Sequence, residues 1–227
     1  MKTSKINGEW TTKELQINKN WLINLDHLDK QELFKATKFA IKSNKSLYDI
    51  KVSDFPLNNF VNKINLIKKQ IQFGFGFVVI KGLPITEFND EETKVMLWGL
   101  GQYLGYPEKQ DKAGSLLHVV TDTGASFANT DHIRGFQTNE ELQFHTDGAD
   151  IFALLCIRNA KTGGLSKLVS SVAIFREIEQ NRPDLARVLQ QKFHFDSRTQ
   201  NPNDDKIQKI PIFVKHDNLI TALYKRR

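Results

Sequence analysis

The feature that most restricts the fold of this chain is a series of short segments, rich in β-forming residues, that begins after Gly105. Polar or glycine-bearing turns separate the first four of these segments, which cover residues 116–121, 142–146, 151–157 and 165–171. Short strands at such spacing are typical of an antiparallel barrel or sandwich rather than of βαβ units. We therefore predict a core built mainly from β-strands.

The β-rich region resumes after a helical interlude at about residues 172–191, which contains Pro183. Two further segments have the composition of strands, residues 192–199 and 210–215. The turn-forming residues His216, Asp217 and Asn218 then lead into a predicted returning strand at 219–224.

Residues 1–105 have instead the patterns of helices and loops. Four apolar residues at helical spacing predict a helix that ends at Gly74: Phe60, Ile64, Ile67 and Ile71. Residues 75–80 form a short apolar run suited to a buried strand. Asn89 and Glu92 are a predicted capping pair for a second helix, which ends at Gly105. We expect one domain over residues 1–227, with a helical layer at about 1–105 packed on a β core at about 106–227.

Composition narrows the partners that the chain can have. It contains no run of 18 apolar residues, and its basic N-terminus lacks an apolar segment, so we expect no membrane partner, no signal peptide and a cytoplasmic location. The net charge is +6, but the basic residues are dispersed, which argues against a nucleic-acid partner. The single cysteine, Cys156, excludes an internal disulfide, and its place in an apolar segment predicts a buried, inert thiol.

The pattern His-x-Asp carries the most chemical content and occurs at residues 27–29, 145–147 and 194–196. On a strand, positions i and i+2 project from the same face, so the pattern places an imidazole beside a carboxylate. These are two of the three ligands of a 2-His-1-carboxylate facial triad. The first occurrence lies at the head of a predicted helix, where i and i+2 do not share a face. The third lies on a predicted strand without a glycine-rich context, but the pattern alone does not separate it from His145 and Asp147. For His145 and Asp147 the alternative to a metal site is an internally hydrogen-bonded pair.

The surroundings of His145 and Asp147 distinguish this occurrence. An apolar segment follows the His-Thr-Asp motif, then the pair Gly163-Gly164, then a segment rich in hydroxyl groups that contains Ser166. In this order of features the chain resembles the TauD/TfdA family of iron(II)- and 2-oxoglutarate-dependent dioxygenases. The resemblance extends over about residues 10–227 and is specific between about 138 and 171.

The resemblance implies a fold, a set of ligands and a reaction. The fold is a double-stranded β-helix, or cupin-like jelly roll, with helices packed outside. His145 and Asp147 match the Fe(II) ligands, and Ser166 matches a hydroxyl residue near the distal carboxylate of 2-oxoglutarate. The reaction hydroxylates a C–H bond of a small-molecule substrate, consumes O2 and releases succinate and CO2. The substrate itself is not indicated.

Two residues that the resemblance implies have no counterpart in the sequence. The family has a second histidine on a late strand and an arginine shortly after it, whereas only 80 residues follow Asp147. Residues 210–225 resemble a mid-barrel hairpin, with His216 on a turn that should face water, and Arg226 and Arg227 follow no histidine strand. We therefore expect the closing strands to be missing and the chain to be a fragment or truncated form of a longer dioxygenase. Open strand edges favour self-association, so we also expect a homo-oligomer.

Two other interpretations stay open at this point. A family remnant without catalysis, which acts as a binding or interaction module or has no function, accounts for the missing ligand and arginine. A basic nucleic-acid binder is a weaker alternative, because only the pI near 9.3 supports it.

Overall fold

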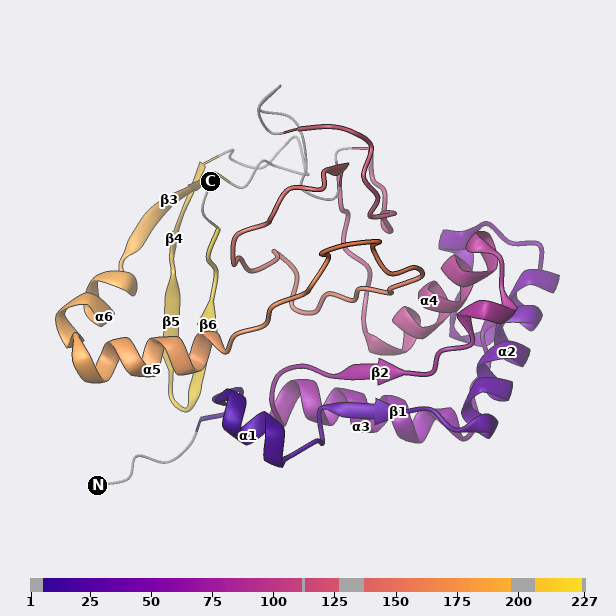
Figure 1. Ribbon diagram of the computed structural model, residues 1–227, viewed down its shortest axis with the longest axis horizontal. Coiled ribbons are helices and arrows are strands. Elements are labelled where there is room, and N and C mark those ends of the chain that lie inside the picture. The colour runs from indigo at the N-terminus through magenta and orange to yellow at the C-terminus, as the bar shows by residue number, and fades with distance from the viewer. Residues whose placement is uncertain (1–5, 112, 127–136, 197–206, 226–227) are drawn as a thin grey trace. The chain divides into compact units, whose positions relative to one another are not determined.

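The computed structural model describes residues 6–111, 113–126, 137–196 and 207–225 (Figure 1). Backbone contacts group the chain into two compact units. The first unit contains residues 1–107, 153–188 and 214–221, and the second contains 108–152, 189–213 and 222–227. The expectation of one domain stays a prediction.

The N-terminal part of the first unit is helical, as the sequence predicts. It contains four α-helices and three short 3-10 turns: α1 (Thr12–Ile17), α2 (His27–Lys42), η1 (Leu47–Asp49), η2 (Val52–Asp54), α3 (Phe60–Phe73), η3 (Ile85–Glu87) and α4 (Asp90–Leu104). The predicted apolar stripe of α3 is buried at Phe60, Ile64 and Ile67. In α4, the side chain of Asn89 accepts from the Glu92 amide and that of Glu92 accepts from the Asn89 amide, which confirms the capping pair.

The core of this unit lies where α2 and α4 pack together. Leu33 of α2, Met96 of α4 and Phe55 from the segment before α3 are fully buried. The indole of Trp98 donates a hydrogen bond of 3.1 Å to the Ile50 carbonyl, so α4 is also tied to the 3-10 turns. Burial of apolar side chains of this size stabilises a fold by about 1.5–3 kcal/mol each.

The strand expected at residues 75–80 forms only in part. Strand β2 covers Val79–Lys81 and pairs in parallel with β1 (Leu22–Asn24), in a sheet of two strands. Val79 is 40% exposed, so the prediction of a buried strand is wrong. The physical reason is that a two-stranded sheet has few neighbours to cover its faces, whatever the apolarity of the strand.

The remaining elements of the first unit follow the glycine pair. Helix α5 (Ser171–Asn181) ends before Pro183, which is the first residue of α6 (Pro183–Leu189), as expected for a proline that cannot continue a helix. Strands β5 (Phe213–His216) and β6 (Leu219–Ala222) form a hairpin. Most of the hairpin belongs to the first unit, and its end residues Phe213 and Ala222 are grouped with the second. Asp217 in its turn has φ of +52°, a conformation that Asp tolerates better than most residues.

The second unit contains one antiparallel pair of strands. Strand β3 (Lys192–Asp196) pairs with β4 (Ile207–Pro211), with Lys192 opposite Pro211 and Asp196 opposite Ile207. Residues 197–199, which we expected to extend β3, lie outside the described residues. The predicted strand at 210–215 is divided between β4 and β5 at Ile212.

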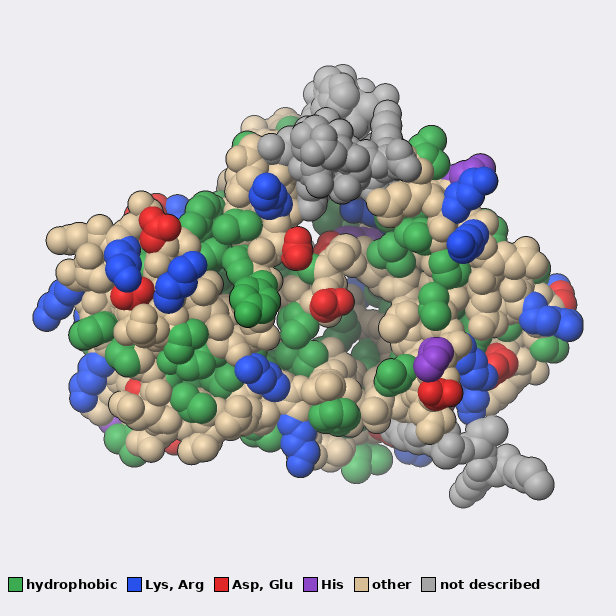
Figure 2. Space-filling view, turned by 180° about the vertical axis from the view of Figure 1, so that it is seen from behind, with side chains coloured by type: hydrophobic (Ala, Val, Ile, Leu, Met, Phe, Trp, Pro, Cys, Tyr) green, Lys and Arg blue, Asp and Glu red, His purple; other side chains and the backbone are tan. Residues whose placement is uncertain are grey.

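The four strands expected between residues 116 and 171 are not observed. The described residues between Gly105 and Ser170 form no strand, and no closed barrel is present in the described parts of the chain. Large apolar side chains in these segments are exposed, among them Leu142, Phe144, Phe152, Leu154 and Leu165. Figure 2 shows hydrophobic side chains at the surface on the face that it draws. A strand exists only where a neighbour pairs with its backbone, and β-forming composition does not supply that neighbour.

One further finding concerns membranes. No helix in the described parts of the chain is long and apolar enough to cross a bilayer.

Candidate metal centre

His145 and Asp147 belong to the second unit, and their side chains lie close together. His145 Nε2 is 3.9 Å from Asp147 Oδ1. The side chains are 33% and 47% exposed, so both are accessible to a ligand from solvent. The segment is not a strand, yet the i, i+2 spacing still places an imidazole next to a carboxylate. Their role as metal ligands stays a prediction.

The tautomer of His145 follows from its second nitrogen. His145 Nδ1 lies 2.7 Å from the Gln143 carbonyl oxygen, which can only accept a hydrogen bond. Nδ1 therefore carries a proton and donates, and in the neutral imidazole Nε2 keeps its lone pair on the side of Asp147. Metal-binding histidines commonly donate their other ring N–H to a backbone carbonyl in this way, which fixes the ring. The local geometry thus leaves the correct nitrogen available for a metal.

The spacing of the pair is wider than that of neighbouring ligands on one ion. Bonds from a metal to an imidazole nitrogen or a carboxylate oxygen are about 2.1 Å long, so two ligands at right angles, as in a facial triad, lie about 3.0 Å apart. The 3.9 Å between His145 Nε2 and Asp147 Oδ1 exceeds this, so the two side chains would have to rotate toward each other to share an ion. In the described parts of the chain, no group of three or more His, Cys, Asp or Glu residues is placed to hold a metal. The described residues thus offer two protein ligands, which leaves most coordination positions to other donors.

The segment that carries the two residues is held by Thr146, which lies between them. The Thr146 amide donates to the Tyr224 carbonyl over 2.8 Å, and the Tyr224 amide donates to Thr146 Oγ1 over 2.9 Å. Neither residue was singled out from the sequence, because 78 residues separate them and no local pattern predicts the contact.

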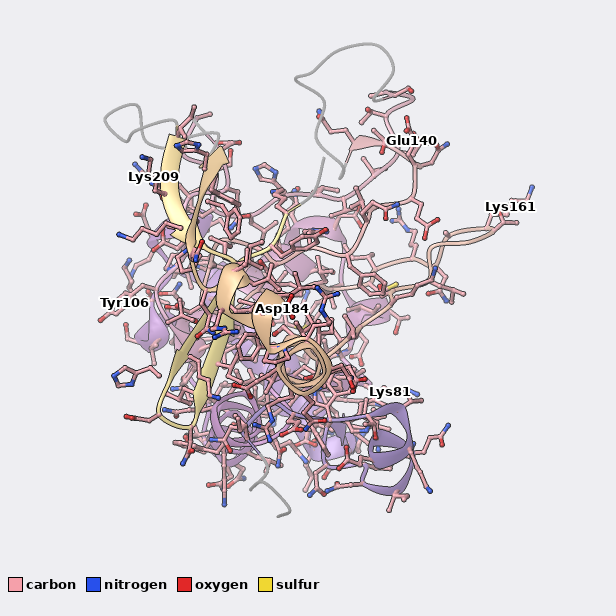
Figure 3. The ribbon with its side chains drawn as sticks, turned by 90° about the vertical axis from the view of Figure 1, so that its left-hand side faces the viewer. Lys81, Tyr106, Glu140, Lys161, Asp184 and Lys209 are labelled. Carbon is pink, nitrogen blue, oxygen red and sulfur yellow. The ribbon has the colours of Figure 1, made fainter. Side chains whose placement is uncertain are left out.

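Ser166, the predicted 2-oxoglutarate contact, is exposed and belongs to the first unit. The loop before it projects outward, with Lys161 near its tip (Figure 3). Gly163 and Gly164 follow with φ of +71° and +68°, a left-handed conformation that only glycine adopts readily. This conformation therefore explains why glycine occupies both positions. His145 and Asp147 belong to the other unit, and the role of Ser166 stays a prediction.

The other two His-x-Asp occurrences have different surroundings. Asp29 accepts from the Asp26 amide as part of the capping box of α2 and pairs with Lys63 at 2.9 Å, which supports its exclusion as a ligand. His194 lies on β3, as predicted, and is exposed.

Two further predictions concern single residues. His216 on the hairpin turn has a side chain that is 83% exposed, as expected. Cys156, by contrast, is exposed, so the prediction of a buried thiol is wrong. The expected burial depended on a paired strand around Cys156, and that strand does not form.

A polar cluster that the sequence did not reveal lies in the same unit as His145. Asp111 accepts a hydrogen bond from the Ser115 amide at 2.9 Å, and its other oxygen lies 3.0 Å from His118 Nε2. Hydrogen bonds from Ser115, and then the neighbouring His118, lower the pKa of the Asp111 carboxyl to about 2. Asp111 therefore stays ionised at all physiological pH values.

Comparison with known proteins supports one family. Residues 43–226 match the taurine catabolism dioxygenase TauD, TfdA family. The chain is 27% identical over 216 residues to FR-33289 synthase of Streptomyces rubellomurinus, an alignment that covers 95% of this chain and 64% of that protein. It is 26% identical over 232 residues to taurine hydroxylase-like protein SAT17 of Stachybotrys chartarum, which covers 98% of this chain and 59% of that protein. The chain thus spans less than two thirds of the length of these curated relatives.

Proposed function

Because the chain belongs to the TauD/TfdA family, we propose that it is an Fe(II)- and 2-oxoglutarate-dependent dioxygenase, or the part of one that carries the first two metal ligands. The reaction is the hydroxylation of a small-molecule C–H bond with O2, with release of succinate and CO2. One observation carries the proposal. The His-Thr-Asp motif, which lies inside the matched residues, leaves His145 Nε2 free at 3.9 Å from Asp147 Oδ1. The family implies a cupin-like fold, to which the described sheets would contribute.

In this proposal, His145 and Asp147 hold the iron and Ser166 receives the co-substrate. The Nδ1–H donation to Gln143 orients the imidazole and raises the basicity of Nε2. The Ser166 hydroxyl can donate to the distal carboxylate of 2-oxoglutarate. When bound, the iron supplies the oxygen chemistry, while the protein supplies ligands and orientation.

Direct binding measurements test the proposal without a known substrate. Under anaerobic conditions, Fe(II) and 2-oxoglutarate are titrated into the full chain, and their complex is followed by its visible charge-transfer absorption. We expect His145→Ala and Asp147→Ala to weaken the binding of Fe(II) by about tenfold or more. The matched controls are His216→Ala and Asp217→Ala, because these side chains lie on an exposed turn of β5 and β6. An unmodified chain that binds neither Fe(II) nor 2-oxoglutarate overturns the proposal.

A second candidate is a family member that binds a partner or ligand but does not catalyse. A facial triad needs three protein ligands, and the described residues place no group of three together. This observation favours the second candidate. This candidate predicts no succinate when Fe(II), 2-oxoglutarate and O2 are supplied together. Formation of succinate that stops in His145→Ala excludes it.

A further inference from the structure

The residue between the two candidate ligands makes an unusual double contact. Thr146 N donates to the Tyr224 carbonyl at 2.8 Å, and Tyr224 N donates to Thr146 Oγ1 at 2.9 Å. The Thr146 hydroxyl also lies 3.4 Å from the Tyr224 carbonyl oxygen. All these atoms belong to the second unit.

The geometry of this contact shows what the side chain of Thr146 does. In a hydrogen-bonded pair of an antiparallel sheet, two residues exchange two backbone N–H to C=O bonds. Here the Thr146 hydroxyl takes the place of the Thr146 carbonyl as the acceptor. The contact between these two segments therefore depends on the identity of residue 146, whereas a backbone ladder would not.

The segment that contains Tyr224 also forms a backbone hydrogen bond to Ile212. The Leu223 amide donates to the Ile212 carbonyl at 2.9 Å, and the Ile212 amide donates to the Leu189 carbonyl at 3.1 Å. The amide of residue 223 bonds to Ile212 and that of residue 224 bonds to Thr146, so these two residues connect Thr146 to Ile212. Thr146 is thus attached to a segment that is already anchored.

We propose that Thr146 is a positioning residue for the metal pair, and that the segment after β6 controls metal affinity through it. The inference rests on the proposed function, because it assumes that His145 and Asp147 bind the metal. Rotation about the Thr146 backbone changes the separation of the two flanking side chains. The bonds to Tyr224 restrict that rotation and so limit how far the two side chains, 3.9 Å apart here, can separate.

The test compares variants that differ in one hydroxyl group. Thr146→Val keeps the shape of the side chain and removes the acceptor, whereas Thr146→Ser keeps it. Tyr224→Pro removes the amide that donates to Oγ1, and Tyr224→Phe is the matched control because only backbone atoms of Tyr224 take part. Co(II) is titrated into each full-length protein and followed by its d–d absorption, and thermal unfolding is measured without metal.

We expect Thr146→Val and Tyr224→Pro each to weaken the binding of Co(II) by about tenfold and to alter the d–d spectrum. Thr146→Ser and Tyr224→Phe should stay within about twofold of the unmodified chain. The double variant Thr146→Val/Tyr224→Pro should bind no more weakly than either single variant, because both changes remove the same hydrogen bond. A merely structural contact would lower thermal stability and leave affinity and spectrum unchanged.

The outcomes separate this inference from the proposed function. If His145→Ala abolishes Co(II) binding while folded Thr146→Val binds as the unmodified chain does, only the positioning role is overturned. Equal losses in Thr146→Ser and Thr146→Val also overturn it. If the unmodified chain binds no Co(II), the proposed function and this inference both fail. Should Thr146→Val not fold, Tyr224→Pro tests the same bond.

Discussion

The hydroxyl of Ser170 donates a hydrogen bond of 2.6 Å to the carbonyl oxygen of Gly8, 162 residues earlier in the chain. Ser170 Oγ also accepts from the Ala173 amide at 2.9 Å and so caps the N-terminus of α5. Gly8 in turn donates from its amide to the carbonyl of Gly74, which ends α3. One buried hydroxyl therefore joins the start of the chain to α5, and through Gly8 to α3.

We expect Ser170→Ala to lower the free energy of unfolding by about 1–3 kcal/mol. The change removes a helix cap and leaves the Gly8 carbonyl without this donor at a site where Ser170 is only 4% exposed. Chemical denaturation followed by circular dichroism measures the effect. Ser171→Ala is the matched control, since it changes the adjacent serine without removing the cap, and an equal loss in both variants would contradict the assignment.

Two glycines of α4 should respond to alanine with opposite signs. A Cβ at Gly99 would lie 2.2 Å from Cδ2 of the buried Phe55 ring, whereas a Cβ at Gly101 meets nothing within 4 Å. We expect Gly99→Ala to destabilise the protein by about 1–3 kcal/mol or more through overpacking. Gly101→Ala should stabilise it by about 0.5–1 kcal/mol, because alanine loses less backbone entropy in a helix. Melting temperatures that shift in the same direction would refute this packing.

Glu32 of α2 caps a different helix from a distance. Its carboxylate accepts from the amides of Asn58 and Phe60, at the start of α3. We expect Glu32→Ala to cost about 0.5–2 kcal/mol of stability, in the range of a lost helix cap. Glu87→Ala, which removes an exposed carboxylate, is the control for charge alone. Equal unfolding midpoints for the Glu32→Ala and Glu87→Ala proteins would show that this cap contributes nothing.

The lowered pKa of Asp111 predicts that the stability of the protein depends on pH. Its pKa in the folded protein is about 2, below the ordinary 3.8, chiefly because Ser115 donates hydrogen bonds to it. A lowered folded pKa means that the stabilisation is fully present above about pH 4 and is lost as the pH falls toward 2. Ser115→Ala should therefore raise the pKa of Asp111 toward 3.8. A titration of the carboxyl carbon by NMR measures both values, and an unchanged pKa in Ser115→Ala would rule out this cause.

The elements that local residues specify could be predicted well. The reciprocal bonds of Asn89 and Glu92 act over three residues, and the apolar stripe of Phe60, Ile64 and Ile67 is set by the helical repeat. For the candidate site, the local pattern predicted that two side chains separated by one residue lie close together, and His145 Nε2 is 3.9 Å from Asp147 Oδ1. Their role as metal ligands stays a prediction.

Other features depended on partners that the local pattern does not identify. The exposure of Val79 and Cys156 and the missing strands between 116 and 171 all follow from which segments pair and which stay unpaired. The contacts of Thr146 with Tyr224 and of Ser170 with Gly8 cross 78 and 162 residues, respectively.

The sequence by itself determined where α3 and α4 end, the cap of α4 and the His-Thr-Asp motif, because each depends on residues close together in the chain. Only the tertiary structure decided which apolar segments are buried and which residues hold His145 and Asp147 in place. Burial and hydrogen bonding between distant segments depend on the arrangement of the whole chain, since a strand or a buried side chain is stabilised by its neighbours in space.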